Sequence, residues 1–175
     1  MDINKILAVA KDIDPTASLI EYREQWTLVL TDKASIVPLL DALKSGGYFD
    51  MLTDITAIDW ATKQPRFELV YFLCSVPNKD MLRISVPIEE DACSCQTAEG
   101  VYPSANWYER EVWDMYGITF DGHSDMRRFY MPEDFFNAET GEQYHPLRKD
   151  FPLTGIPDSL PLPPFPEKTG IVVEY

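Results

Sequence analysis

One stretch dominates the sequence, and it reads WYEREVWDMYGITFDGHSDMRR (107–128), FYMPEDFFNAETGEQ (129–143) and YHPLRKDFPLTG (144–155). It contains both histidines of the chain, two of its four tryptophans and its densest alternation of acidic and basic residues. Most of the functional information lies here. The rest of the chain is expected to form a small domain that supports this stretch.

The first part of the stretch is predicted to form a helix. Ser104 lies where this helix would begin, and serine is a residue type that often caps helix N-termini. Tyr108, Val112 and Met115 recur at helical spacing, so they would share one apolar face. Gly117 is a natural end, because glycine readily adopts the left-handed conformation that follows a helix.

The polar side of this helix is unusual. Its charged residues alternate in sign within two turns, as Glu109, Arg110, Glu111 and Asp114. Arg110 and Asp114 are one turn apart and can pair, which would contribute roughly 0.2–0.5 kcal/mol if the pair is exposed. The side is either a solvated charged face or a docking face, since arginine and tryptophan are enriched at binding hot spots.

Two segments resemble the signatures of a known family. The first runs from Glu109 to Arg128 and the second from His145 to Gly155. Both are similar to the 30 kDa subunit family (the C subunits) of respiratory complex I, the NADH:quinone oxidoreductase. The stretch FDMLTDITAIDW (49–60) also resembles the family's central strand.

The chain departs from the family pattern at three places. Ser124 stands where the family has proline after Gly-His, and Tyr144 stands where it has glycine before His-Pro. Residues 136–143 resemble a small insertion between the two signatures. Loss of the proline is expected to loosen the turn after His123, since proline fixes φ and serine does not.

The resemblance implies a non-catalytic subunit of the peripheral arm. A family member of this kind has no cofactor itself, whereas the complex uses NAD(H), FMN, iron–sulfur clusters and quinone. It packs on the large D subunit, next to the quinone site and the terminal iron–sulfur cluster, at the cytoplasmic face of the inner membrane. The residues implied to contact or shape this interface are Glu109, Arg110, Glu111, Trp113, Asp114, Arg127, Arg128, His145, Arg148, Lys149 and Asp150.

Other functions remain open at this point. The same module could serve a ferredoxin- or deazaflavin-linked quinone reductase, or a membrane-bound hydrogenase. A freestanding metal-dependent hydrolase using His123 and His145 is a remote alternative, because the sequence has no helical H-x-x-x-H spacing. A soluble adaptor outside respiration is a third. No glycine-rich phosphate loop points to a nucleotide site in this chain.

The composition of the chain argues against several kinds of partner and cofactor. The net charge of −14 argues against nucleic acid and against direct docking on an anionic bilayer. No run approaches the roughly 18 apolar residues of a membrane-spanning helix, and no signal peptide is evident. The three cysteines cannot supply the four thiolates of a common iron–sulfur cluster. Cys93 and Cys95 are expected in a polar connecting loop over 88–100.

The rest of the chain predicts an α+β fold. The expected elements are helices over 3–10 and 36–43, a hairpin of strands over 18–22 and 26–31, strands over 49–60, 67–74 and 81–86, and a short strand over 118–120. This order predicts a mostly antiparallel sheet with helices on one face. Asp54 and Asp59 have opposite parity, so they should point to opposite faces of their strand.

The C-terminal segment has a different composition. Five prolines lie between Pro157 and Pro166, which favours an extended conformation over helix or central strand. The same segment is too apolar for a typical disordered tail. We therefore expect a domain over 1–155 and an extended Pro-rich arm over 156–175 that lies along a partner.

Overall fold

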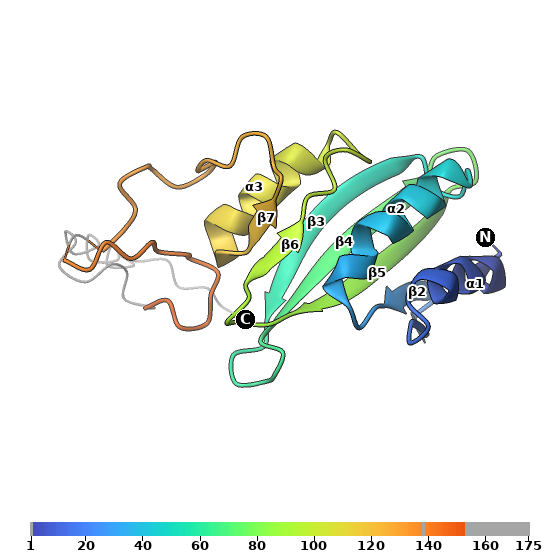
Figure 1. Cartoon of the computed structure of the whole chain (residues 1–175), viewed down its shortest axis with the longest axis horizontal. Coiled ribbons are helices and arrows are strands. Elements are labelled where there is room, and N and C mark those ends of the chain that lie inside the picture. Colours follow the sequence, from blue (N-terminus) through green and yellow to red (C-terminus); the bar gives the residue numbers. More distant parts are fainter. Residues whose placement is uncertain (1, 138, 153–175) are drawn as a thin grey trace, which may run out of the picture.

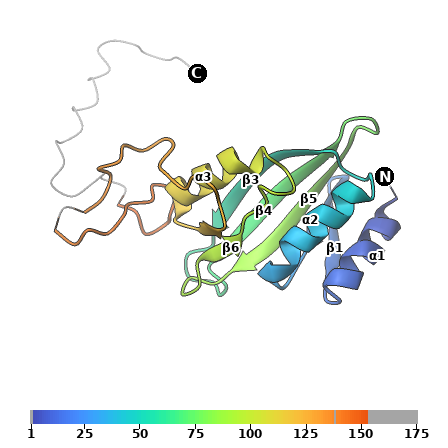
Figure 2. The same cartoon turned by 45° about the horizontal axis from the view of Figure 1, so that its top comes forward.

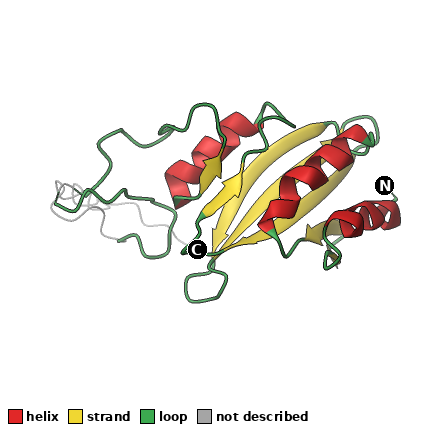
Figure 3. Ribbon diagram, viewed as in Figure 1, coloured by secondary structure: helices red, strands yellow, loops and turns green. Residues whose placement is uncertain are grey.

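The fold is an α+β layer around a five-stranded sheet (Figures 1 and 3). It comes from a computed structural model that describes residues 2–137 and 139–152. The elements are α1 (Ile3–Ile13), β1 (Ser18–Tyr22), β2 (Gln25–Val29), η1 (Lys33–Ser35), α2 (Ile36–Ser45), β3 (Met51–Asp59), β4 (Phe67–Ser75), β5 (Asp80–Ile88), β6 (Ser94–Gln96), α3 (Ala105–Tyr116) and β7 (Thr119–Asp121). The predicted arm over 156–175 lies outside the described residues.

The sheet has the strand order β1-β2-β5-β4-β3. Every pairing is antiparallel except that of β2 with β5, which confirms the predicted fold class. β4 is an interior strand, and its run of apolar residues on both faces matches that position.

Helices α1 and α2 cover one face of the sheet (Figure 2). Leu39, Leu40 and Leu43 of α2 are fully buried in a core that also contains Leu69 and Leu73 of β4. Burying one leucine stabilises a fold by about 1.5–3 kcal/mol. This apolar layer forms the core of the domain.

Helix α3 runs beside β3, the outer strand at one edge of the sheet (Figures 1 and 2). The hydroxyl of Ser104 donates to the carbonyl of Leu52 at 3.2 Å. It makes no side-chain cap to α3, although it occupies the predicted N-cap position. The hydroxyl of Tyr102 donates to the carbonyl of Phe49 at 2.9 Å. These two bonds attach the segment just before α3 to backbone carbonyls at the start of β3.

The segment 88–100 is more ordered than predicted. It contains β6, which pairs in parallel with β7, and Cys95 there lies opposite Phe120. The thiol of Cys95 is buried, and burial raises its pKa to about 11. The loop prediction was wrong here because three polar or small residues show no strand pattern. Their pairing partner comes only after α3.

Candidate functional site at α3 and the segment that follows it

Asp114 is the centre of the site. Its carboxylate is fully buried and accepts a hydrogen bond of 2.6 Å from Arg128 Nη1. It also accepts backbone N–H bonds from Phe129, Tyr130 and Met131 at 3.2, 2.7 and 2.8 Å. Burial alone would raise the pKa of Asp114, but these donors hold it below its ordinary value. One carboxylate therefore fixes four consecutive residues onto α3.

Arg110 does not pair with Asp114, so that prediction was wrong. Its guanidinium is buried and donates to the carbonyls of Arg127 at 3.2 Å and Arg128 at 3.1 Å. The segment after His123 lies over this side of α3. Both charged side chains therefore bond to that segment and not to each other.

Glu109 is also inside the protein. Its carboxylate accepts hydrogen bonds from Thr97 Oγ1 at 2.6 Å and from the Ala98 N–H at 2.7 Å. Burial raises the pKa of Glu109 above its ordinary value. The idea of a solvated charged face is thus wrong for Glu109, Arg110 and Asp114, whereas Glu111 and Trp113 are only half-buried.

The second signature packs on the end of α3. His145 Nδ1 donates to the carbonyl of Asp114 at 3.1 Å, and the Leu147 N–H donates to that of Met115 at 3.1 Å. Gly117 has φ +80°, and a Cβ added there would lie 2.8 Å from the His145 ring. Glycine is required at this point by both the backbone conformation and the close approach of the ring.

An ion cluster anchors the end of the second signature. Arg66 pairs with Asp59 at 2.9 Å and with Asp150 at 3.0 Å. The Lys149 N–H donates to Asp59 at 2.7 Å, and Arg148 bonds Asp150 at 3.1 Å. Burial would raise the pKa of Asp59, but the bonds from Arg66 and from the backbone N–H groups of Lys149 and Ala61 hold it well below its ordinary value. The segment is thereby tied to the β3–β4 hairpin.

At Ser124, hydrogen bonds replace the restraint that proline would give to the turn. Its backbone N–H and its hydroxyl both donate to the Glu99 carboxylate, at 3.1 and 2.7 Å. Proline has no N–H and could not make the first of these bonds. The turn that we expected to be loose is therefore held by Glu99.

The two histidines form hydrogen bonds with different parts of the chain. His123 Nε2 donates to the carbonyl of Asn106 at 3.0 Å, and its Nδ1 accepts from the Asp125 N–H at 3.0 Å. His145 bonds Asp114, as described above. Within residues 2–137 and 139–152, no group of three or more His, Cys, Asp or Glu is arranged to hold a metal ion.

An aromatic patch, formed by Trp107, Phe129 and Tyr130, lies on the surface of this site. These side chains are 55%, 39% and 57% exposed. The ring centroids of Trp107 and Phe129 are 5.5 Å apart, and those of Phe129 and Tyr130 are 4.5 Å apart. Arg110 lies against the first two rings at 5.1 and 5.4 Å. None of these three residues was among the predicted interface residues, although two aromatic residues directly after an Arg-Arg pair are a usable signal.

The comparison with known families decides the identity. The family described as "Respiratory-chain NADH dehydrogenase, 30 Kd subunit" matches residues 29–157. The chain belongs to this family. The match includes both signatures and strands β3, β4 and β5 of the sheet, whereas β1 and nearly all of β2 precede it.

Several relatives have names that agree with this family. The C subunit of the NADH-quinone oxidoreductase of Geotalea uraniireducens is 45% identical over 141 residues, which cover 81% of this chain and 80% of that protein. The C subunit of the Trichlorobacter lovleyi enzyme is 48% identical over 143 residues, covering 79% and 83%.

Two solved structures share the fold. A trypsin-resistant fragment (1–134) of Nqo5 has a TM-score of 0.64 at 27% identity and covers 71% of this chain and 99% of its own. A chain of the membrane-bound sulfane sulfur reductase, an archaeal respiratory membrane complex, has a TM-score of 0.68 at 29% identity and covers 87% of each. In the part of our chain that the structure describes, no helix has the length and apolarity needed to span a bilayer.

Proposed function

We propose that this chain is a non-catalytic peripheral-arm subunit of a proton-translocating NADH:quinone oxidoreductase. It would dock on the large D subunit, next to the terminal iron–sulfur cluster. We call this partner the quinone-site subunit. The complex would lie at the cytoplasmic face of the inner membrane. The NAD(H), FMN, iron–sulfur clusters and quinone would be bound by other subunits. The observation that carries the docking role is the exposed aromatic patch on a rigid, internally bonded base.

The physical case rests on preorganisation. Arg110, Asp114 and Arg128 form their hydrogen bonds inside the chain, where they fix the segment after α3 in one conformation. A surface that is already ordered loses little entropy on binding. Aromatic side chains on such a surface are typical of the few contacts that dominate binding energy.

The candidate interface residues divide by exposure. Arg127, Lys149 and Asp150 are exposed and can reach a partner, although Arg127 and Asp150 also form ion pairs within the chain. The side chain of Arg128 is only 5% exposed, and it lies with Glu109, Arg110 and Asp114 beneath the surface. We infer that the buried group shapes the interface from below, while the exposed group and the aromatic patch contact the partner.

A related complex is the second candidate. The archaeal sulfane sulfur reductase chain covers more of our chain than the Nqo5 fragment does, with a slightly higher TM-score. The same module could therefore serve a complex with another electron donor or acceptor, such as a ferredoxin- or deazaflavin-linked reductase or a membrane-bound hydrogenase.

The test is native purification of a tagged full-length chain from detergent-solubilised membranes. The wild type should bring the quinone-site subunit, iron–sulfur proteins and membrane subunits in stoichiometric amounts, and an NADH-binding flavoprotein among them would favour the first candidate. The Trp107→Ser, Tyr130→Ser double variant should lose most of the quinone-site subunit, because it removes the two most exposed rings of the patch.

Val76→Ser is the matched control. Val76 is 57% exposed in the β4–β5 turn, so its replacement removes a similarly exposed apolar side chain away from the patch. It should retain the whole complex. If the double variant recovers as much of the quinone-site subunit as the control, the patch is not the docking surface.

A further inference from the structure

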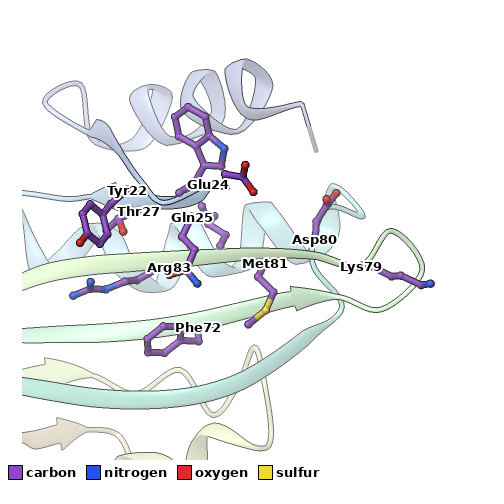
Figure 4. Close-up of a pocket in the computed structure, with 11 residues that line it drawn as sticks. Tyr22, Glu24, Gln25, Thr27, Phe72, Lys79, Asp80, Met81 and Arg83 are labelled. Carbon is purple, nitrogen blue, oxygen red and sulfur yellow. The ribbon is translucent and has the colours of Figure 1, made fainter.

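A pocket of about 500 Å³ lies where β2 and β5 separate (Figure 4). The register between these strands runs only from Thr27/Arg83 to Val29/Ser85. Toward the turns, Gln25 of β2 and Met81 of β5 therefore lie beyond the paired part of the ladder. The edges of two strands thus border one opening in the sheet.

The walls of the pocket combine apolar and polar side chains. Tyr22, Phe72 and Met81 supply the apolar part, and Tyr22 and Met81 are 65% and 61% exposed. Thr27 and Arg83 supply polar groups (Figure 4). A volume in the range of about 300–1,000 Å³ with a few polar groups among apolar walls is typical of binding sites.

Arg83 has unused hydrogen-bonding capacity. Its side chain is 35% exposed, and its bond from Nη2 to Glu68 is a long one of 3.3 Å. Glu68 is shared, because it also accepts from Ser85 Oγ at 2.5 Å and Trp60 Nε1 at 2.9 Å. The Nε–H of Arg83 is buried without an acceptor among the described residues. A guanidinium has five N–H donors, so Arg83 can bond a ligand without giving up Glu68.

We propose that this pocket binds the carboxylate of an acidic side chain carried by an extended segment of a partner protein. A carboxylate matches the planar fork of a guanidinium and can accept two parallel bonds from it. Glu24, Lys79 and Asp80 also line the pocket, so its rim carries both signs and favours a single, oriented carboxylate over a strongly charged ligand.

The surroundings favour a peptide segment over a free small acid. Ile20 of β1 is 55% exposed and lies in one row with Thr27 and Arg83 across the sheet. A small acid in the pocket would leave this apolar side chain in water, whereas an extended segment would cover it. The unpaired strand edges can also bond the backbone of such a segment.

This site is separate from the aromatic patch. All of its lining residues come from the β1–β2 hairpin, β4, β5 and the turn before β5, and none comes from α3 or the segment that follows it. The inference therefore does not depend on which complex the chain joins. It gives the domain a second contact with a partner.

The test uses the ¹⁵N-labelled full-length chain and NMR titration with the blocked peptide N-acetyl-Val-Glu-Val-amide. Saturable shifts are expected for the backbone amides of Tyr22 and Met81 and for the Arg83 side-chain Nε–H. N-acetyl-Val-Gln-Val-amide should bind at least tenfold more weakly, because it lacks the negative charge. Equal binding of the two peptides, or no saturable shift with the glutamyl peptide, would overturn the proposal.

Variants and a free acid complete the experiment. Arg83→Gln should lose binding, and Tyr22→Ser should weaken it several-fold even if Arg83→Gln fails to fold. Arg127→Gln removes an exposed arginine elsewhere and should bind as the wild type does. Loss of binding in that control would show a general charge effect and refute the site. Acetate that binds as tightly as the glutamyl peptide would refute a peptide segment as the ligand.

Discussion

At the scale of single residues, the buried charges of this domain act as internal anchors. Asp114 accepts from Arg128 and three backbone N–H groups, and Asp59 accepts from Arg66 and two more. A buried carboxylate is stable only when donors surround it. Each anchor therefore determines the path of a segment that has little regular secondary structure of its own.

Asp114→Asn tests the first anchor. The amide keeps the size of the side chain but removes its charge and one acceptor oxygen, which leaves Arg128 without its counterion. Breaking a buried pair in this way costs about 3–5 kcal/mol. Urea unfolding monitored by tryptophan fluorescence should show this loss.

Arg127→Gln is the matched control for that variant. Arg127 pairs with Asp125 at 2.9 Å on the surface, where both side chains are largely exposed. Exposed pairs contribute about 0–1 kcal/mol, so its unfolding midpoint should hardly change. Similar losses in both variants would contradict the anchoring role of Asp114.

We expect the stability of the domain to depend on pH through His145. Burial, together with Arg128 and Arg148, lowers the pKa of its imidazole below the ordinary value. As the pH falls through about 6.5, His145 becomes protonated in the unfolded chain but stays neutral in the folded chain. The folded state therefore loses stability relative to the unfolded state. One such proton contributes at most about 1.4 kcal/mol per pH unit.

The measurement is urea unfolding of the wild type and of His145→Asn at pH 7.5 and 5.5. The asparagine amide can still donate to the Asp114 carbonyl but does not titrate. The wild type should lose more stability between the two pH values than the variant does. An equal loss in both would show that other groups cause the dependence.

The limits of sequence-based prediction are clearest at this scale. The signatures drew attention to Asp114, Arg128 and His145, but the alternating charges gave no sign that several of them are buried. The bond from Lys149 to Asp59 joins residues 90 positions apart. Local patterns carry no information about such a contact, because it depends on how distant elements pack.

At the scale of elements, the helix and strand predictions were largely confirmed. Helix α3, the β1–β2 hairpin and strands β3, β4 and β5 lie close to their predicted ranges, since each has a clear apolar periodicity. Among the described strands only β6, which is short and polar, was missed. The placement of α3 beside β3 also could not be predicted, because an apolar face does not specify what covers it.

Gly117→Ala tests the end of α3. A non-glycine residue in the left-handed conformation costs about 1–2 kcal/mol, and the new Cβ would lie 2.8 Å from the His145 ring. The variant should lower the melting temperature by several degrees. Gly100→Ala is the control, since a Cβ there meets nothing within 4 Å and the glycine has no left-handed φ. A Gly117→Ala protein as stable as this control would contradict the requirement for glycine.

At the scale of the whole molecule, the domain and the arm should have separate roles. The aromatic patch and the anchors lie within residues 2–152. The arm over 156–175 stays a prediction, because it lies outside the described residues. The Nqo5 structure is that of a trypsin-resistant fragment (1–134) of its protein, and it covers 71% of this chain.

Deletion of the chain after Gly155 tests this division. The truncated protein should unfold with a cooperative transition close to that of the full chain, because all of the anchors described above are retained. It should be incorporated into the membrane complex less well, since the arm is expected to lie along a partner. Failure of the truncated chain to fold would show that the arm belongs to the core.

The tie between Asp59 and Lys149 also has a consequence for the order of events during synthesis. Ribosomes add about 5–20 residues per second, so the 90 positions between these residues take roughly 5–18 s to be made. During that interval the β3–β4 hairpin can form, but Asp59 and Arg66 still lack the partners that Lys149 and Asp150 supply. The second signature reaches its place only when nearly the whole domain has left the ribosome. Formation of the complete ion cluster is therefore a late step in the synthesis and folding of the protein.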